Sequence, residues 1–382
     1  MSGNFEPHQS SNWKDTKIGE ILALEYGKGL KQYQDNIGNY EVFGTNGKIG
    51  RTDSYLYDKP SLVIGRKGAY RGVHLAKNPF FVIDTAFYTK SKIDELDIVY
   101  LYYWFKCIDI NSMDSGSAIP STSRDEVYDL DISLPSLQEQ KAIAAVLYSL
   151  DDKIDLLHRQ NLTLEAMAET LFRQWFIEEA QEDWEEKSLL DFVELVGGGT
   201  PKTSINEYWN GDIPWLSGGD IATNHKGFVS VSEKTISKTG LDNSSAKLLP
   251  KFATVISARG TVGKYCLLAG DMAFSQSNYG ILPKIEGCYF FTYLMVNHLV
   301  EELQSAAYGS VFDTITTATF RDATFTIPPT DKILDFEKAI TKFFDKKLLN
   351  QNQIQTLENL RDTLLPKLMS GEVRVRLDEE MV

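Results

Sequence analysis

Basic side chains stand among glycines in two segments of this chain, each directly after a short apolar and β-branched run. The first segment runs from Ile64 to Gly72 (IGRKGAYRG) and the second from Ile256 to Lys264 (ISARGTVGK). Glycine lets a backbone approach a ligand closely, and arginine offers a planar donor fork that suits a phosphate or the edge of guanine. A hairpin turn with exposed basic residues is the alternative interpretation. Because the arrangement occurs twice, we favour a role in binding.

A third glycine-rich segment, Val196–Thr203 (VGGGTPKT), stands ahead of Tyr208-Trp209. Its backbone amides are suited to cradle a phosphate, which Lys202 would neutralise. At the corresponding place near the N-terminus the chain has only Gly27–Lys31 (GKGLK). We therefore expect the two halves of the chain to bind different things.

Motifs of catalysis are absent from the sequence. A nucleotide-binding loop has four residues between its first glycine and Gly-Lys-Ser/Thr, whereas Gly260–Tyr265 (GTVGKY) has two and ends in tyrosine. Asn78–Phe81 (NPFF) lacks the second proline of a methyltransferase motif, and the Glu-x-Lys of Asp183–Lys187 is common in charged sequences. The 5 histidines lack ligand spacing, and the 3 cysteines fit a reducing compartment. We predict no catalytic site and no metal site.

A long internal repeat relates the elements that must position these segments. When the sequence is shifted by 193 residues it matches itself without a gap over the last third of each half, and a shift of 192 aligns the region before it. The matching pairs are Gly116-Ser117 with Gly309-Ser310, Leu134-Pro135 with Ile327-Pro328, Asp152-Lys153 with Asp345-Lys346, Leu164-Glu165 with Leu357-Glu358, Leu171 with Leu364, Val63-Ile64 with Val255-Ile256, and Gly68 with Gly260. Near the start of each domain, Trp13-Lys14 resembles Trp184-Glu185, outside these two shifts. A repeat of this length is a duplicated domain with its connector.

The connectors carry the clearest structural pattern, an apolar heptad seam from Ile143 to Trp175 and its copy from Phe336 to Leu368. Pro135-Ser136 and Pro328-Pro329 are typical helix starts, and Ser370-Gly371 is a typical helix end. Two long helices, one after each domain, pack most economically antiparallel against each other. The seam residues that we predict are Leu147, Leu150, Ile154, Leu157, Leu164, Leu171, Ile340, Phe343, Ile354, Leu357 and Leu364.

Polar residues interrupt both seams: Asn161 in the first, and Lys347, Asn350 and Arg361 in the second. They either fix the register of the helix pair at some cost in stability, which we favour, or mark where another protein docks. A seam of this length would span about 50 Å at ~1.5 Å per residue. That corresponds to about 15 base pairs, an upper bound on the separation at which two modules could read duplex DNA.

Charge and composition bound the class of protein. With 382 residues, 42% of them hydrophobic, the chain is long enough for two or three globular domains. It has no apolar run long enough for a membrane span and no signal-peptide pattern at its start, so we expect a cytoplasmic protein. The net charge of -14 sits mainly outside residues 28–92 and 198–284, which are locally basic, so it does not exclude a nucleic-acid partner.

Within each half, short β-rich runs alternate with glycine and proline clusters and with helical stretches. The runs are Ser61–Ile64, Phe80–Ile83 and Ala253–Ser257, and the helical stretches are Asp97–Lys106 and Phe290–Ser305. The predicted fold class is α+β: two mixed α/β domains joined by two long antiparallel helices that form a coiled coil, with a pseudo-two-fold internal repeat.

The region Leu134–Asp155 resembles the conserved helical region of the specificity subunit of type I restriction–modification enzymes. Further matches follow in the order of that family, and the combination spans nearly the whole chain. They are Thr200-Pro201, Tyr208-Trp209, Ile213–Trp215, Asp220-Ile221, Ser257–Gly263 and Leu364–Gly371. The second connector departs from the family at Asp331–Asp335, where the first has Gln138–Ala142, and the first domain lacks the Thr-Pro and Tyr-Trp elements.

The resemblance implies a non-catalytic DNA-specificity subunit with two target-recognition domains, each reading one half of a split site. It also implies that the helices space these domains and bind two modification subunits. S-adenosylmethionine, ATP and magnesium would be held by partner subunits, restriction subunits among them, and this chain would hold no cofactor. The expected boundaries are 1–134 and 181–327 for the domains, 135–180 and 328–372 for the connectors, and 373–382 for the tail.

Basic and polar side chains on loops of each domain should contact phosphates and base edges. We predict DNA contacts by Arg66, Lys67 and Arg71 in the first domain and by Lys202, Arg259 and Lys264 in the second. Two other functions stay open on the residues alone. One is a scaffold whose modules bind protein instead of DNA. The other is a single-chain methyltransferase or nuclease, which the missing motifs disfavour.

Overall fold

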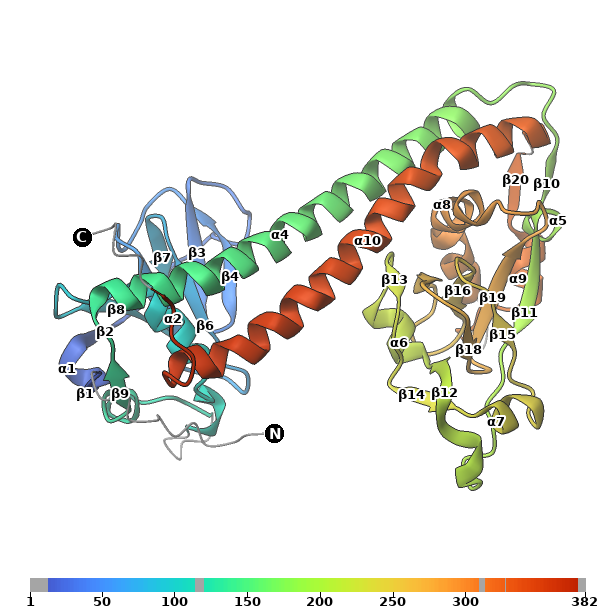
Figure 1. Cartoon of the computed structure of the whole chain (residues 1–382). Helices are drawn as coiled ribbons and strands as arrows, with labels where there is room; N and C mark the ends of the chain where they lie inside the picture. Colours follow the sequence, from blue (N-terminus) through green and yellow to red (C-terminus); the bar gives the residue numbers. More distant parts are fainter. Residues whose placement is uncertain (1–12, 114–119, 309–312, 327, 377–382) are drawn as a thin grey trace. The chain divides into compact units, whose positions relative to one another are not determined.

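The computed structural model describes residues 13–113, 120–308, 313–326 and 328–376, and the chain in it divides into two compact units. Unit 1 comprises Met1–Asp155 and Gln355–Val382, and unit 2 comprises Leu156–Ile354. Each of the two long helices, α4 (Leu137–Arg173) and α10 (Thr330–Met369), therefore contributes residues to both units (Figure 1). Each unit is described by itself below.

Unit 1 contains a globular domain followed by α4. Its elements in chain order are β1 (Lys14–Lys17), α1 (Ile18–Ile21), β2 (Leu22–Tyr26), β3 (Tyr40–Gly44), β4 (Gly47–Thr52), β5 (Ser61–Gly65), β6 (Val73–Ala76), β7 (Phe80–Val82), β8 (Ala86–Ser91), α2 (Ile98–Lys106), α3 (Arg124–Tyr128) and β9 (Asp131–Leu134). They form a four-stranded sheet in the order β2-β8-β5-β6, a three-stranded sheet β4-β3-β7 and the pair β1-β9. The strands pair antiparallel apart from β3 and β7, which run parallel.

Unit 2 contains a second domain with the same order of elements and a few additions. They are β10 (Glu186–Ser188), α5 (Leu189–Phe192), β11 (Val193–Gly197), β12 (Trp209–Leu216), α6 (Gly218–Thr223), β13 (Phe228–Val229), β14 (Lys234–Ile236), α7 (Lys238–Asp242), β15 (Leu248–Leu249), β16 (Thr254–Ser257), β17 (Tyr265–Leu268), β18 (Met272–Phe274), β19 (Asn278–Pro283), α8 (Tyr289–Tyr308), α9 (Thr317–Asp322) and β20 (Thr324–Thr326). The sheets run β11-β19-β16-β17-β13 and β14-β12-β18-β15, with β10-β20 as a separate pair.

The two sheet orders match strand for strand. In each unit the strand after the first short helix pairs with the last strand of the larger sheet, as β2 with β8 and β11 with β19. In each smaller sheet one pair is parallel, β3 with β7 and β12 with β18. Unit 2 adds β13 and β15 at the sheet edges. The predicted strands after residues 60, 79 and 252 are confirmed as β5, β7 and β16.

The long helices begin and end near the predicted signals. Helix α4 begins at Leu137, where the Ser136 carbonyl accepts from the Gln140 amide at 2.9 Å, and it passes into a π-helical turn at Gln174–Glu178. Helix α10 begins directly after Pro328-Pro329 and ends at Met369, with Gly371 at a φ of 75°. Glycine is favoured there because this left-handed conformation crowds a Cβ atom.

Parts of the two helices pack side by side within each unit, running in opposite directions. In unit 1 the core contains Ile143 and Leu147 of α4 together with Leu368 of α10. In unit 2, Phe172 of α4 and Phe176 of the following π-helical turn pack against Phe336 near the start of α10, with ring centroids 5.9 and 4.8 Å from that of Phe336. No helix in the described part of the chain is long and apolar enough to cross a membrane.

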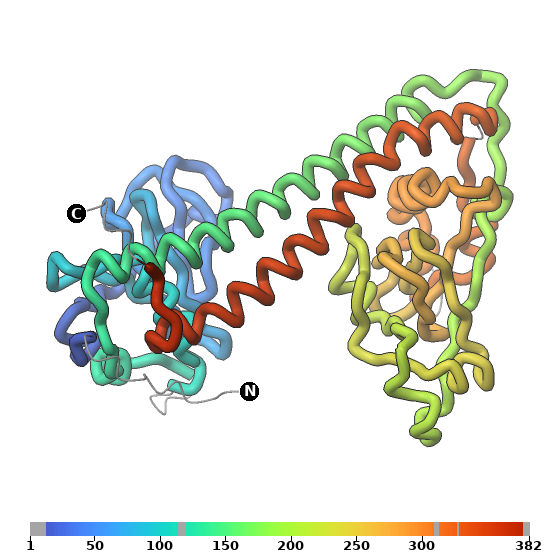
Figure 2. Tube along the Cα trace, viewed as in Figure 1, coloured from blue at the N-terminus to red at the C-terminus, as the bar shows by residue number. Residues whose placement is uncertain are grey.

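The segment after α10 returns to the domain of unit 1 (Figure 2). Arg374 donates two hydrogen bonds to the Glu139 carboxylate at 2.7 and 2.6 Å, and the Trp13 indole donates to the same carboxylate at 3.2 Å. Glu139, in the first turn of α4, therefore joins the described ends of the chain. The matched glycines at 116 and 309, Ile327 and the last six residues of the predicted tail lie outside the described residues.

Candidate nucleic-acid interface

Four loops of unit 1 converge at one end of its strands, after β2, β3, β5 and β7. The amides of Arg66 and Lys67 donate to the Thr85 carbonyl at 2.9 and 3.2 Å. The Thr45 hydroxyl lies 2.7 Å from both the Lys67 and the Thr85 carbonyls. The Gly27 amide donates to the Ala86 carbonyl at 3.1 Å, which ties the loop after β2 to the same place. The basic glycine-containing turn of unit 1 is therefore fixed beside three other loops.

The equivalent four loops of unit 2, after β11, β12, β16 and β18, converge in the same way. The Gly199 amide donates to the Phe274 carbonyl at 2.9 Å, and the Ala258 amide donates to the Ser277 carbonyl at 2.9 Å. The Thr261 hydroxyl donates to the Gly218 carbonyl at 3.2 Å. Each domain therefore presents one composite loop surface at the same end of the same strands, built on a shared backbone framework.

The predicted DNA contacts of unit 1 divide into two groups. Lys67 is exposed, and Arg66 is half-buried with one guanidinium nitrogen donating to the Asp84 carbonyl at 3.0 Å. Arg71 is only 4% exposed, and its guanidinium donates to the carbonyls of Asn111 and Met113 at 3.1 and 2.7 Å. DNA contact by Arg71 stays a prediction, which its burial does not favour, because its Nη2 atom bonds to the backbone of residues 111 and 113.

In unit 2 the predicted residues are more accessible. Lys202 and Arg259 are exposed, and Gly260 beside Arg259 adopts a φ of 78° with open space around it. Lys264 is half-buried at the start of β17, close enough to His225 that its charge, after the larger effect of burial, lowers the pKa of that imidazole. Their role in DNA contact stays a prediction. Lys202 and Arg259 are accessible enough for such a contact, and Lys264 is partly accessible.

Three residues of the unit 1 surface escaped the sequence analysis. Tyr26, at the end of β2, is 48% exposed and packs on Phe87, with ring centroids 5.1 Å apart. The Cζ atom of Arg124 lies 3.9 Å and that of Arg66 4.9 Å from the centroid of the Tyr26 ring. Tyr70, in the glycine-containing turn, is 80% exposed. Tyr26 stands directly before the Gly27–Lys31 segment, which was a usable signal, but nothing local marks Arg124.

The helix seam residues lie as a seam requires, although their role stays a prediction. Leu147, Ile154, Leu157, Ile340 and Ile354 are buried, and the other six, Leu150, Leu164, Leu171, Phe343, Leu357 and Leu364, are half-buried. The polar interruptions meet polar partners on the other helix. The Asn350 amide donates to the Asn161 side-chain oxygen at 2.9 Å in unit 2, and Arg361 pairs with Asp151 at 2.9 Å in unit 1.

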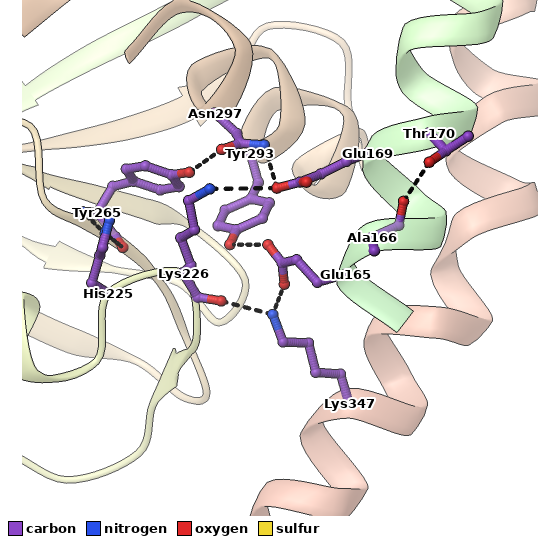
Figure 3. A network of polar contacts seen from close by, with 10 residues as sticks. All are labelled: Glu165, Ala166, Glu169, Thr170, His225, Lys226, Tyr265, Tyr293, Asn297 and Lys347. Atoms are coloured by element: carbon purple, nitrogen blue, oxygen red, sulfur yellow. Dashed lines mark hydrogen bonds and ion pairs between the residues drawn. The ribbon is translucent and has the colours of Figure 1, made fainter. Parts of the chain in front are cut away.

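A buried polar network in unit 2 joins both long helices to the domain (Figure 3). The Glu165 carboxylate of α4 contacts the ammonium of Lys347 on α10 and accepts a hydrogen bond from the Tyr293 hydroxyl of α8 at 2.8 Å. The Lys347 ammonium also donates to the Lys226 carbonyl at 2.7 Å. Burial lowers the pKa of Lys347 to about 7, which the contact with Glu165 opposes.

Around this centre, a second carboxylate of α4 extends the network. Glu169 accepts from the Asn297 amide at 2.8 Å and pairs with the Lys226 ammonium at 3.5 Å. Nearer the start of α10, the Glu337 carboxylate accepts hydrogen bonds from the backbone amides of Phe290 and Phe291 at 3.0 and 2.7 Å. These amides lie in the first turn of α8, where amides have no carbonyl partner within the helix. Burial raises the pKa of Glu337 to about 7.

These polar groups hold α4 and α10 against the domain, and the contact of Glu165 with Lys347 and Tyr293 is called the helix lock of unit 2. No cluster of three or more His, Cys, Asp or Glu side chains suited to a metal occurs in residues 13–113, 120–308, 313–326 and 328–376. Among the groups with shifted pKa values, Tyr103, Tyr293, Glu337 and Lys347 hydrogen-bond to other groups of the protein. On the two loop surfaces, the exposed groups that could contact a ligand are hydrogen-bond donors and aromatic rings.

Comparison with known proteins agrees with this arrangement. The profile of the family described as type I restriction modification DNA specificity domain matches the chain twice, over residues 10–166 and 181–360. The type I restriction enzyme MjaIX specificity subunit of Methanocaldococcus jannaschii is 25% identical, over 89% of this chain and 85% of the relative. The HindI specificity subunit of Haemophilus influenzae is 23% identical, over 68% and 72%.

The fold agrees as well. The crystal structure of a type I restriction-modification system S subunit from M. genitalium superimposes with a TM-score of 0.71 at 18% identity, covering 96% of this chain and 99% of that one. The two family matches together span both domains and most of both long helices. The chain therefore belongs to the family of type I restriction–modification DNA specificity subunits and carries two of its specificity domains.

Proposed function

We propose that the chain recognises a bipartite DNA site, one half through the loop surface of each domain. The observation that carries this proposal is the pair of composite loop surfaces, which share a backbone framework and differ in side chains. A site read by two such surfaces would have two different halves. As a specificity subunit the chain is not catalytic, and methylation and cleavage lie in other subunits.

We propose further that α4 and α10 form an antiparallel coiled coil and that the two domains are related by a pseudo-two-fold axis. Support comes from the opposed helix packing within each unit and from the polar pairs Asn161–Asn350 and Asp151–Arg361. Such polar contacts in an apolar seam favour one register over its neighbours. In this proposal the helix length sets the number of base pairs between the half-sites.

Two modification subunits are the partners that we propose for the outer faces of the helices. Leu156 and Met167 of α4 are 38% and 46% exposed, and Leu349 and Leu360, which occupy the same repeat positions in α10, are 50% and 44% exposed. A spacing of 11 residues returns to nearly the same side of an α-helix. Matching exposed apolar residues on both copies favour two like partners, because exposed apolar side chains mark protein interfaces when they recur in this way.

The cofactors remain assigned to those partners. S-adenosylmethionine, ATP and magnesium would bind to modification and restriction subunits, and this chain would determine the DNA site at which they act. Leu349→Asp should weaken association with a modification subunit because it places a charge in an apolar contact, whereas Asp345→Asn, on an exposed position of the same helix, should not. Co-purification of each variant with the modification subunit measures this.

The experiment that tests the function is methylome sequencing of cells that carry this chain together with its modification subunits. A methylated motif of two specific halves separated by a fixed number of unspecified bases is the expected result. Exchange of unit 2 residues 198–283 for those of a relative should change one half of the motif and leave the other. A continuous motif, or no motif in cells where the complex assembles, would contradict the proposal.

A further inference from the structure

The Tyr26 ring is the centre of a charged stack on the loop surface of unit 1. Arg124 and Arg66 place their Cζ atoms 3.9 and 4.9 Å from the ring centroid, and both also lie near Phe87, at 6.0 and 5.9 Å. Contacts at these distances are cation–π interactions. The three residues come from separate parts of the chain: Tyr26 ends β2, Arg66 follows β5 and Arg124 begins α3.

The positive charge of this stack is not neutralised by the part of the chain that the structure describes. Neither guanidinium forms an ion pair with a described carboxylate, and the hydrogen bond of Arg66 goes to a backbone carbonyl, that of Asp84. The Nε atom of Arg124 is buried and has no hydrogen-bond partner among the described residues. By contrast, Arg361 and Arg374 of the same unit each pair with a carboxylate. Two arginines held without a counterion indicate a site for an external anion.

The stack is also held in place before any ligand arrives. The Arg66 amide donates to the Thr85 carbonyl at 2.9 Å, and the Thr122 amide donates to the Arg66 carbonyl at 2.9 Å. Arg124 opens α3, where Ser123 caps the helix through a reciprocal bond with Glu126. Because backbone and rings fix both guanidiniums, less side-chain entropy is lost on binding than for lysines on a mobile loop.

The stack lies beside the exposed Lys67 and close to Lys28, whose amide donates to the Val82 carbonyl at 2.9 Å in the same group of loops. Guanidinium forks match the oxygens of a phosphodiester, and half to two-thirds of protein–DNA hydrogen bonds go to the backbone. Resting on the proposed function, we propose that Tyr26, Arg66 and Arg124 form a preorganised clamp for phosphates of the DNA backbone next to the half-site of unit 1. Tyr26 acts as a positioning residue, since its ring orients both cations.

The test uses the chain in complex with its modification subunits and two duplexes, one with the motif found by methylome sequencing and one with that motif scrambled. Arg124→Ala should weaken binding to both duplexes about tenfold, the loss of one charge-assisted contact. It should also lower the slope of log affinity against log salt by about 1, the signature of one lost phosphate. Arg66→Ala should act in the same direction.

Variants of the ring separate positioning from bulk stability. Tyr26→Phe keeps the ring and should bind as the wild type does, whereas Tyr26→Leu should weaken binding to both duplexes with an unchanged thermal unfolding midpoint. The matched control is Lys77→Ala, which removes another cation that lies over a tyrosine, 3.5 Å from the Tyr148 centroid, in the loop between β6 and β7 at the other end of the strands. Its salt slope should equal that of the wild type.

Unchanged affinity and salt slope in Arg124→Ala would overturn the clamp. So would a loss confined to the motif duplex with an unchanged slope, because that result would make Arg124 a reader of a base edge. If the wild-type complex binds neither duplex, the proposed function fails, and that outcome is distinct from a failure of the clamp.

Discussion

The two domains have the same framework at equivalent places and carry different side chains on it. In the larger sheets Tyr26 pairs in register with Phe87, and Gly197 pairs in the same way with Tyr279. The amide of Thr122 bonds to the Arg66 carbonyl in unit 1, and the amide of Ile315 bonds to the Ala258 carbonyl in unit 2. Unit 2 therefore has glycine and alanine where unit 1 has a tyrosine and an arginine.

This difference separates what folds the domain from what it binds. Apart from those of the Thr45 and Thr261 hydroxyls, the bonds that join the loops use backbone groups, so most loop side chains can change without loss of the framework. On its loop surface unit 2 has exposed cations at Lys202 and at Arg259, and Arg259 is the equivalent of Lys67 in unit 1. A half-site read by unit 2 should consequently differ both in bases and in phosphate contacts from that read by unit 1.

The helix locks give a second comparison. In each unit a tyrosine hydroxyl donates a hydrogen bond to a carboxylate of α4, and the same carboxylate pairs with a cation of α10. In unit 1 the tyrosine is Tyr103, the carboxylate is Asp151 and the cation is Arg361. In unit 2 the carboxylate and the cation are Glu165 and Lys347, which are 10% and 8% exposed, against 29% and 27% for the pair of unit 1. The two locks have the same chemistry in different dielectric surroundings, so their energies should differ.

The largest expected effect follows from Glu165→Gln. The variant leaves the buried Lys347 ammonium without its counterion, which should lower the free energy of unfolding of unit 2 by about 3 kcal/mol at pH 6, where the lysine is charged. Urea denaturation followed by tryptophan fluorescence measures this, since four of the chain's 6 tryptophans, Trp175, Trp184, Trp209 and Trp215, lie in unit 2.

The double variant Glu165→Leu with Lys347→Met is the control for this experiment. Apolar side chains of similar size replace both charges, so much of the lost stability should return. A loss below about 1 kcal/mol in Glu165→Gln would contradict the buried character of the pair, because such a value is typical of solvated ion pairs.

Much of this architecture could be predicted from the sequence. The heptad period placed the long helices, since apolar side chains at that spacing must be buried. The strands β5, β7 and β16 followed from β-branched runs between turns. The polar interruptions Asn161 and Asn350 were predicted to fix register, and the structure brings their side chains together.

The loop surfaces could be predicted only in part. Arg66 and Lys67 were predicted from the glycines beside them and have accessible surface, and their contact with DNA stays a prediction. Arg71 in the same segment donates to carbonyls of residues 111 and 113, which no local pattern reveals. Arg124 reaches Tyr26 across 98 positions of sequence. Such contacts depend on tertiary packing, so spacing along the chain carries no information about them.

The next effect concerns pH and again distinguishes the units. The Glu337 pKa is raised to about 7 by burial, so the folded protein holds a proton that the unfolded chain releases from about pH 4.5 upward. This contribution to stability is fully present below pH 4.5 and is lost as pH rises through about 7, a change of roughly 3 kcal/mol. Glu337→Gln should remove this dependence.

Urea midpoints between pH 4.5 and 7.5, taken for the wild type and for Glu337→Gln, measure the difference. The matched control is Glu301→Gln on the exposed face of α8, which should follow the wild type. Parallel pH curves for the wild type and Glu337→Gln would show that the carboxylate is ionised throughout. In unit 1 the Gln140 side-chain oxygen makes a comparable contact: it accepts from the backbone amide of Asp97 at 2.8 Å, and this group does not titrate.

Arg259→Ala should have an effect on DNA binding without an effect on the fold. The side chain is exposed, so its removal should weaken binding to the motif duplex about tenfold while the unfolding midpoint is unchanged. Lys251→Ala is the matched control, since Lys251 is exposed before β16 at the opposite end of that strand. Affinity equal to that of the wild type at physiological salt would remove Arg259 from the interface.

The smallest expected effect is that of Asp151→Asn in the lock of unit 1. The asparagine oxygen can still accept from the Tyr103 hydroxyl, now 2.6 Å from the carboxylate, and Arg361 keeps its contact with Asp362 at 2.8 Å. Because both partners of the lost pair are more than a quarter exposed, water replaces much of the attraction, and we expect a loss below about 1 kcal/mol. Urea denaturation of this variant beside Glu165→Gln compares the two locks directly. Equal losses would mean that burial does not set their strength, and that the polar contacts of the two units are equivalent in energy despite their different surroundings.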